Sequence, residues 1–210
     1  MSRERREKEK LILFDNFSSE GVIGYPFINP GPIGGSPVAG NETEPSMELF
    51  IRWWQLATFL PQTHFLTPPV TFRSSYIPLV EKKLRKIKNN IVNPLLRKFS
   101  REAMERSLPI IRPLWMLHPT DERCLTIKDQ FLVGDSLLVA PVVERGKNRR
   151  NVYLPSGPDG ADIIWKQDDG RYYAGGQWLN GTLVPLDRIL YYERQAEGAR
   201  PGDTISLGGR

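Results

Sequence analysis

The segment from Gln130 to Pro155, QFLVGDSLLVAPVVERGKNRRNVYLP, limits the fold of this chain more than any other. It holds three short apolar runs, at residues 131–133, 136–143 and 151–154, which are separated by a Gly-Asp turn and a charged loop. Short apolar runs divided by turn residues are typical of antiparallel strands. The pattern therefore predicts an all-β region from about residue 126, with further strands at 162–165, 183–185 and 189–192.

The part of the chain before this region is predicted to be mainly helical, with loops and a few short strands. Residues 21–28, GVIGYPFI, form a nearly continuous apolar run, which is typical of a strand buried on both faces in a parallel barrel. A loop rich in Pro and Gly follows at 29–45. Helical spacing then predicts helices over 46–60, with Ser46 as N-cap, over 76–93, and over 95–107, with a kink or restart at Pro94. A short strand is expected at 109–114, with Pro113 at its end.

Composition narrows the class of protein. A hydrophobic content of 40% in 210 residues is that of a globular chain. A single cysteine, Cys124, excludes an internal disulfide, and with only two histidines we expect no metal site and no cofactor. Residues 82–106 carry nine Lys or Arg against two Glu, a net charge of +7. A solvated helix face explains this charge better than a nucleic-acid site, because no nucleic-acid-binding motif accompanies it.

The sequence says less about the two ends of the chain and about the compartment in which the protein resides. Residues 1–13 are expected to be a charged tail, and 194–210, polar and rich in Gly, a disordered one. We find no apolar run long enough for a transmembrane helix and no secretory signal in the charged start. Three Asn-x-Ser/Thr acceptors, at Asn16, Asn41 and Asn180, would matter in a secretory compartment.

Three blocks of sequence, in order, resemble one enzyme family. The first is GYPFINPGPIGGS followed by ELFIRWWQLATFLP, the second is LPIIRPLW at 108–115, and the third is the segment from Gln130 to Pro155. Together they are similar to the C-terminal portion of glycoside hydrolase family 31, the α-glucosidase-like retaining glycosidases. Within that family, GYPFINP, Pro68-Pro69 and residues 93–96 point to the branch of the myogenesis-regulating glycosidases.

This resemblance implies a fold and a division of the chain. The fold class is α/β plus all-β: the last part of a (β/α)8 barrel over residues 14–122, followed by a β-sandwich over 123–193. The active sites of such barrels lie on loops at the carboxyl ends of the strands. The loops at 29–45 and 62–69 are therefore expected to line that face. Open barrel edges would favour self-association, and a parent like the family would reside in the secretory pathway or a lysosome-like compartment.

The catalytic residues of the family are absent from this sequence. Retaining glycosidases use two carboxyl groups about 5 Å apart. In family 31 both are aspartates, in Trp-x-Asp and Gly-Asp-Asn segments, and neither pattern occurs here. Asp135 and the pair Asp168-Asp169 fit turns better than catalysis. We therefore assign no catalytic residue and expect the isolated chain to be inactive.

The remaining candidates are contacts to sugar. Neutral donors and acceptors suit sugar hydroxyl groups, which makes Asn29 and Gln62 candidate substrate-binding residues. His64 could replace a family histidine that aligns with Leu66. The family pattern is also altered at Gly31 and Ser36. Two interpretations stay open: the C-terminal part of a retaining α-glycosidase that hydrolyses O-glycosyl bonds, or a non-catalytic carbohydrate-binding or regulatory remnant of that family.

Overall fold

The computed structural model describes residues 21–34 and 45–195. The charged tail expected at 1–13 and most of the loop expected at 29–45 lie outside the described residues. Arg194, where a disordered tail was expected to begin, is instead the last residue of a strand. The part from 196 onward is outside the described range.

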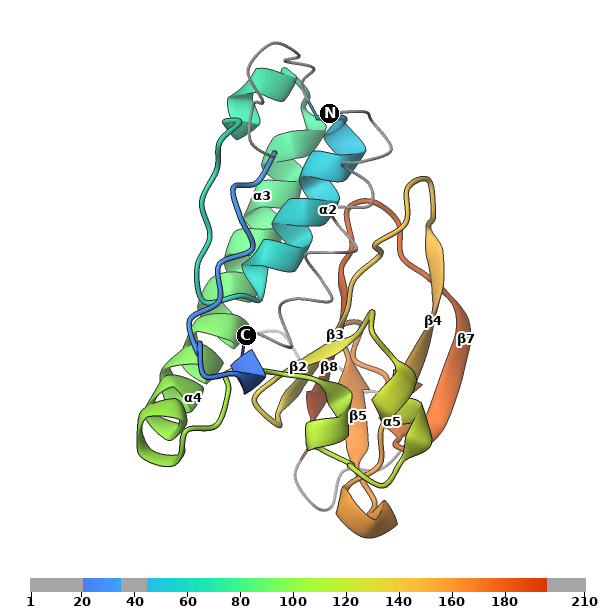
Figure 1. The fold of residues 1–210 in the computed structure, drawn as a ribbon. Coiled ribbons are helices and arrows are strands. Elements are labelled where there is room, and N and C mark those ends of the chain that lie inside the picture. The colour runs from blue at the N-terminus through green and yellow to red at the C-terminus, as the bar shows by residue number, and fades with distance from the viewer. Residues whose placement is uncertain (1–20, 35–44, 196–210) are drawn as a thin grey trace, which may run out of the picture.

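The described residues form helices in the first half and strands in the second (Figure 1). The helices are α2 (Met47–Thr58), α3 (Tyr76–Ile87), α4 (Asn93–Arg106) and the short α5 (Glu122–Thr126). The strands are β1 (Ile111–Arg112), β2 (Phe131–Val133), β3 (Leu137–Ala140), β4 (Arg149–Leu154), β5 (Ile164–Gln167), β6 (Tyr172–Ala174), β7 (Gln177–Leu183) and β8 (Leu190–Arg194).

A six-stranded antiparallel sheet in the order β1-β2-β3-β8-β5-β6 lies at the centre. Residues alternate between its two faces, as the strand period of two requires. Val139 and Tyr191 pack into the core shared with the helices. Leu138 and Tyr192 pack into a second core that includes residues of the separate β4–β7 pair. The sheet is therefore buried between α2–α4 and the β4–β7 pair (Figure 1).

Helix α2 forms as its sequence predicts. Ser46 is the N-cap, and its hydroxyl accepts a hydrogen bond of 3.2 Å from the Leu49 N–H. Glu48 lies in the first turn, where the helix dipole favours an acidic group. The helix ends at Thr58 with Phe59 as its C-cap, so the predicted N-cap is confirmed and the predicted end before Pro61 is met to within two residues.

The two helices expected at 76–93 and 95–107 form one helical run with an interruption between them. Residues Lys88–Val92 form a π-helical turn between α3 and α4. Pro94 has no N–H, and its ring would clash with the carbonyl four residues earlier in a regular α-helix. A π turn directly before the proline widens the helix there. The predicted break at Pro94 is thus confirmed, and it takes the form of a π turn that keeps the chain helical.

The prediction of a buried strand at 21–28 is wrong. Gly21 and Val22 are helical, and the residues that follow form turns and extended backbone. Ile23, Tyr25 and Phe27 are exposed, with more than half of each side chain accessible. A parallel barrel strand needs a partner on each side, and in the described residues nothing pairs with 21–28. An apolar run alone could not reveal that its partners are missing.

The strand-rich region expected after residue 126 is confirmed. Strands β2 and β3 form an antiparallel pair, and the Asp-Asp-Gly turn joins β5 to β6. The strand expected at 183–185 is misplaced, because β7 ends at Leu183 and Pro185 lies beyond it. Strands β6 and β7 were not predicted. The sequence of β7 mixes Gly, Gln and Asn with one aromatic residue, so its alternation is weak, and β6 is only three residues long.

Strand β1 connects the two expected parts of the chain. The segment 109–114 contains β1 as predicted, with Pro113 just after it. β1 pairs with β2 in antiparallel fashion, with Ile111 opposite Val133. It is the edge strand of the central sheet. The last segment before residue 122 therefore hydrogen-bonds directly to the first strand after it.

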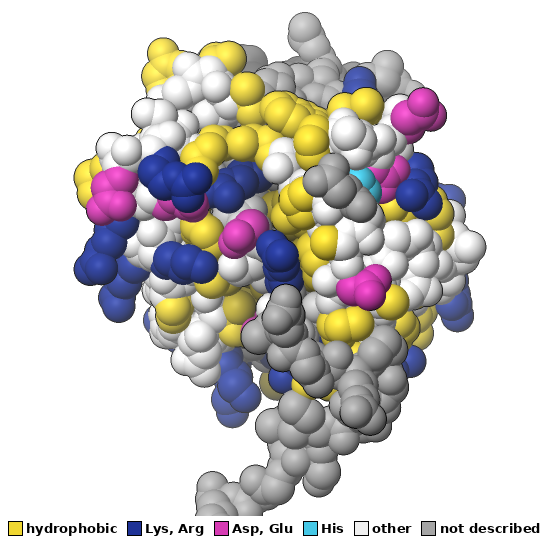
Figure 2. Space-filling model, turned by 90° about the horizontal axis from the view of Figure 1, so that it is seen from below, with side chains coloured by type: hydrophobic (Ala, Val, Ile, Leu, Met, Phe, Trp, Pro, Cys, Tyr) yellow, Lys and Arg dark blue, Asp and Glu magenta, His cyan; other side chains and the backbone are white. Residues whose placement is uncertain are grey.

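The basic residues of 82–106 lie along α3 and α4, and several are paired with acids. Arg85 contacts Glu81, Arg106 contacts Glu102, and Lys83 contacts Asp187. On the face drawn in Figure 2, basic and acidic side chains are interspersed. Within the described ranges, no helix is long and apolar enough to cross a bilayer, and no cluster of His, Cys, Asp and Glu could hold a metal ion.

Candidate functional site

The two loops predicted to bind substrate lie side by side. A single parallel bridge joins Ile33 to Phe65. The Ile33 N–H donates to the His64 carbonyl at 2.9 Å, and the Leu66 N–H donates to the Ile33 carbonyl at 3.1 Å. Segments separated by α2 in the sequence are thereby held together at one end of the helix. We call residues 28–34 and 62–67 the paired loops.

A glycine makes this close approach feasible. Gly34 has a φ of +97°, a conformation that side-chain-bearing residues rarely adopt. A Cβ atom there would lie 2.7 Å from Oγ1 and 2.9 Å from Cβ of Thr67. Any larger residue would therefore have to separate the paired loops. The Gly-Gly sequence reflects both the backbone angle and the contact.

The three predicted substrate-binding residues all lie on the paired loops and are exposed. The Asn29 Oδ1 atom accepts a 3.0 Å hydrogen bond from the Gly31 N–H, so this side chain shapes its own turn. The side chains of Gln62 and His64 lie on the second loop, directly after the end of α2. The structure brings the two loops together, while Ser36, part of the altered family pattern, is outside the described residues.

A cluster of aromatic rings packs between α2 and the paired loops. The ring of Phe65 lies 5.1 Å from that of Trp54 in an edge-to-face arrangement, and the Phe50 and Phe72 rings are 4.5 Å apart. Trp53 and Trp54 are both buried, with 6% and 8% of their surfaces accessible. Neither indole presents a free face to a sugar. Both tryptophans serve the core that positions the loops.

Arg52 and Gln55 attach α2 to the strand-rich region. Arg52 is 3% exposed. Its Nη2 donates to the Val184 carbonyl at 2.8 Å, and its Nη1 donates to the Pro185 and Arg188 carbonyls. Gln55 Nε2 donates to the Leu186 carbonyl at 2.6 Å. We call these contacts the Arg52 clamp. Burial lowers the pKa of Arg52, and the surrounding carbonyl groups offset part of its desolvation.

The Arg52 clamp gives a structural role to Arg52 and Gln55, two residues that matched the family pattern but had no role assigned from the sequence. The sequence indicated only that an Arg and a Gln three residues apart occur on an amphipathic helix. In an isolated helix both would be assigned to the solvated face. Their burial depends on carbonyl groups that lie more than a hundred residues later, between Val184 and Arg188.

The acidic residues of the strand-rich region have structural partners. Arg188 holds Asp168 with two hydrogen bonds of 2.7 Å. Burial raises the pKa of Asp168, and Arg188 opposes that shift. Asp169 is bound by Arg171. Asp135 accepts a hydrogen bond from Ser136 in the β2–β3 turn. The prediction that these acids belong to turns agrees with these contacts.

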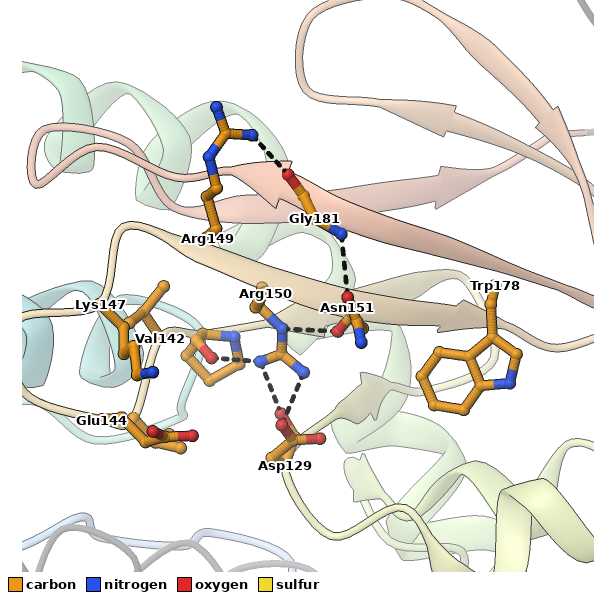
Figure 3. Close-up of a pocket in the computed structure, with 11 residues that line it drawn as sticks. Asp129, Val142, Glu144, Lys147, Arg149, Arg150, Asn151, Trp178 and Gly181 are labelled. Carbon is orange, nitrogen blue, oxygen red and sulfur yellow. Dashed lines mark hydrogen bonds and ion pairs between the residues drawn. The ribbon is translucent and has the colours of Figure 1, made fainter.

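A pocket of about 450 Å³ lies beside β4 (Figure 3). Arg150 lies at its centre, where its Nη2 contacts Asp129 Oδ2 at 2.9 Å and its Nη1 donates to the Asp129 and Pro141 carbonyls. Trp178 stands at one end of the pocket, and Glu144 and Lys147 stand at the other. Since the Arg150 guanidinium already has these partners, the open surface of the pocket is provided mainly by Trp178 and the Glu144–Lys147 end.

Comparison with known families identifies the second half of the chain. Residues 107–197 match the model of the glycosyl hydrolase family 31 C-terminal domain. The chain contains the C-terminal domain of glycosyl hydrolase family 31. The match begins before β1, which is consistent with the pairing of β1 and β2.

Curated relatives carry the similarity further toward the N-terminus. The SITS-binding protein of Tetronarce californica is 39% identical over 181 residues, and the myogenesis-regulating glycosidase of Mus musculus is 37% identical over 178 residues. These alignments cover 86% and 81% of this chain but only 25% and 24% of the relatives. The chain thus spans about a quarter of the length of these two relatives.

Solved structures of family 31 proteins share the fold. An α-xylosidase from a soil metagenome, solved with xylose, is 25% identical and superposes with a TM-score of 0.73 over 86% of this chain and 29% of its own. A dextranase from Flavobacterium johnsoniae, solved with glucose, is 32% identical with a TM-score of 0.61, over 70% of this chain and 18% of the dextranase. Both family 31 structures contain a bound sugar.

Proposed function

We propose that this chain is the C-terminal part of a retaining α-glycosidase-like protein, and that it supplies substrate-contacting loops and structural support but no catalytic aspartate. In this proposal, residues 14–122 are the end of a (β/α)8 barrel and residues 123–193 form the sandwich behind it. The whole protein would hydrolyse O-glycosyl bonds in carbohydrates. The sugar-bound relatives support carbohydrate as the ligand class.

The observation that carries the proposal is the pairing of the two loops through Ile33 and Phe65. A single parallel bridge is the smallest unit of parallel sheet, and parallel sheets occur in α/β folds, which include (β/α)8 barrels. The adjacent exposed residues Tyr25 and Phe27 offer apolar surface to further barrel segments. Asn29, Gln62 and His64 project from the same pair of loops, where barrel enzymes bind substrate.

The first test is catalytic. Purified chain 1–210 is incubated with aryl α-glucoside, α-xyloside and α-galactoside, and release of the aryl group is followed. We expect no turnover above buffer, because a retaining glycosidase needs two carboxyl groups on opposite sides of the scissile bond. Turnover that co-purifies with the folded chain would refute the assignment of no catalytic residue.

The second test concerns the paired loops. Glucose, xylose and isomaltotriose are titrated into the chain by NMR, and the variants N29A, Q62A and H64A are compared with the control variant Q177A, an exposed glutamine on β7. Each loop variant should weaken binding several-fold while Q177A leaves it unchanged. Equal affinity in all four variants would remove these loops from the sugar site.

The alternative is a non-catalytic carbohydrate-binding or regulatory remnant, which the altered family pattern at Gly31, Ser36 and Leu66 favours. The two proposals differ in what upstream sequence would add. If a protein that contains this chain also carries Trp-x-Asp and Gly-Asp-Asn segments, and their aspartates are needed for turnover, the glycosidase is supported. Sugar binding without turnover in that longer protein would support the remnant.

A further inference from the structure

Strand β7 carries an unusual exposed sequence on the side of the molecule away from α3 (Figure 1). Residues 178–182 read WLNGT, in which Asn180-Gly181-Thr182 is an acceptor triplet for N-linked sugar. Asn180 is exposed, and in the described residues its side chain makes no hydrogen bond. The other two acceptor triplets, at Asn16 and Asn41, lie outside the described ranges.

The backbone at Asn180 is shaped by a β-bulge. Arg150 pairs with Thr182 and Val152 pairs with Leu179, so the single residue Asn151 faces both Asn180 and Gly181. Gly181 has a φ of +63°, and its N–H donates to Asn151 Oδ1 at 2.9 Å. Bulges of this type re-aim a side chain and leave one residue outside the ladder. The geometry thus leaves the Asn180 amide available.

On β4, the strand without the extra residue, Asn151 and Tyr153 share one face. Tyr153 pairs with Trp178, and Asn151 faces Asn180 and Gly181, so Trp178 and Asn180 lie on the same side of the strand pair. The indole of Trp178 is 43% exposed. The ring of Tyr153, centred 5.2 Å away, holds it in place from the opposite strand. Trp178 and Gly181, on either side of Asn180, both line the 450 Å³ pocket (Figure 3). An open aromatic face and a hollow of this size therefore lie next to the acceptor.

We propose that Asn180 is an N-glycosylation site and that its first sugar packs on the face of Trp178. The electron-rich face of an indole attracts the C–H groups of a pyranose ring. In the transfer step, Asn180 Nδ2 forms a bond to C1 of the sugar of a polyisoprenyl diphosphate-linked oligosaccharide. The bond from C1 to the diphosphate oxygen breaks, the diphosphate leaves with that electron pair, and the amide loses one proton. The proposal is independent of the glycosidase assignment, and it requires passage through a compartment that holds the transferase.

Occupancy is tested on the chain isolated from eukaryotic cells that make it. Trypsin cuts after Arg171 and Arg188, and the peptide between them contains Asn180 as its single acceptor. Mass spectrometry should find this peptide carrying hexosamine-rich glycan. The variant T182A should abolish the modification, and T182S should retain it. An unmodified Asn180 peptide in wild-type protein would overturn the proposal.

The contact with Trp178 is tested by oxidative footprinting of the folded chain, with oxidation read afterwards in the tryptic peptides that contain Trp178 and Trp115. The glycan is trimmed to one sugar with an endoglycosidase, or removed with an amidase, and Trp178 oxidation is measured. We expect several-fold slower oxidation with one sugar retained than with none, and no change at Trp115, which has a similar 36% exposure. Equal Trp178 rates in the two forms would overturn the packing.

A thermal measurement provides a second readout of the contact. The glycosylated wild-type chain should melt roughly 2–4 °C above its deglycosylated form if the contact contributes about 1 kcal/mol. In W178A the occupancy at Asn180 should persist while this difference in Tm disappears. The same glycan-dependent shift in W178A and in the wild type would overturn the assignment of Trp178.

Discussion

Both faces of the six-stranded sheet are covered, one by α2–α4 and the other by the β4–β7 pair, whereas the helical region leaves several large apolar side chains exposed. Val22, Ile23, Tyr25 and Phe27 have between 47% and 71% of their surfaces exposed, and Val70 on the next loop is 81% exposed. Large apolar side chains that stay exposed are candidates for contact with further protein. Among the described residues, none of the large exposed apolar side chains lies on a strand of the six-stranded sheet, so the comparison predicts that the sheet resists local unfolding better than the helical region does.

Several contacts hold the helical region to the strand-rich region, and two of them can be broken by a single substitution. One is the Arg52 clamp on α2. The other is the contact of Phe99, on α4, with the β2–β3 turn at Gly134, where a Cβ atom would lie 2.0 Å from the Phe99 ring. If the helical region is held only through such contacts, breaking either should loosen it while the sheet persists. The following predictions test this in order of expected effect.

The largest effect is expected for G134A. The new methyl group would overlap the Phe99 ring, and the residue would be held at a φ of +60°, so we expect a loss of about 4 kcal/mol in the free energy of unfolding. The matched control is G146A, since Gly146 has a φ of +70° but an added Cβ would meet nothing within 4 Å. Urea denaturation of both variants separates backbone strain from overlap. Similar losses in both variants would mean that the Phe99 contact is unimportant.

R52L is expected to follow, with a loss of about 3 kcal/mol, because several buried carbonyl groups would lose their donor. Limited proteolysis should cut the α2–α4 region of this variant first and leave residues 107–195 resistant. R85L, which removes a 70% exposed guanidinium, is the control and should change stability little. Simultaneous cleavage of both regions in R52L would contradict the independence of the sheet.

Lys88 links stability to pH inside the helical region. Its Nζ donates to the Leu60 carbonyl at 2.6 Å, and burial lowers its pKa to about 8 from a usual value near 10.5. Between these two values the unfolded chain binds more protons, so stability should rise with pH over this window. From pH 8 to pH 10.5 the free energy of unfolding of the wild type should rise by about 1 kcal/mol relative to that of K88M. This figure is reduced because the Lys88 side chain is partly exposed. A flat difference across this range would contradict the burial of the ammonium group.

The smallest effect is expected at the start of α2. S46A removes the acceptor for the Leu49 N–H and should cost about 1 kcal/mol by chemical denaturation. S46D keeps an acceptor and should retain wild-type stability. If S46A behaves like S46D, the cap at this end of the helical region contributes nothing measurable.

The success of prediction from sequence depended on how local the determining contacts are. Ser46, Pro61 and Pro94 act on their own turns, so the limits of α2 and the break before α4 could be predicted. The Gly134-Asp135 turn likewise defined β2 and β3. Residues 21–28 have a strand-like sequence, but a strand also needs partners, and the sequence contained no information on whether they are present.

The candidate site was predicted only in part. The paired loops were both expected near one another because the resemblance placed them on one face. Their hydrogen bonds through Ile33 and the packing of Gly34 on Thr67 could not be predicted, since these contacts join segments on either side of a helix. The role of Arg52 was missed for the same reason. Asn180 was found as a motif, and Trp178 gained significance only from its position on β7.

The π turn at Lys88–Val92 also sets the rotational phase of α4. A π turn holds an additional residue relative to an α turn, and each residue of an α-helix advances the side-chain direction by about 100°. The side chain of Phe99 faces Gly134 with this extra residue in place. Deletion of one residue from 88–92 would therefore rotate α4 by about that angle and turn Phe99 away from the sheet, although every other residue of the helix would be unchanged.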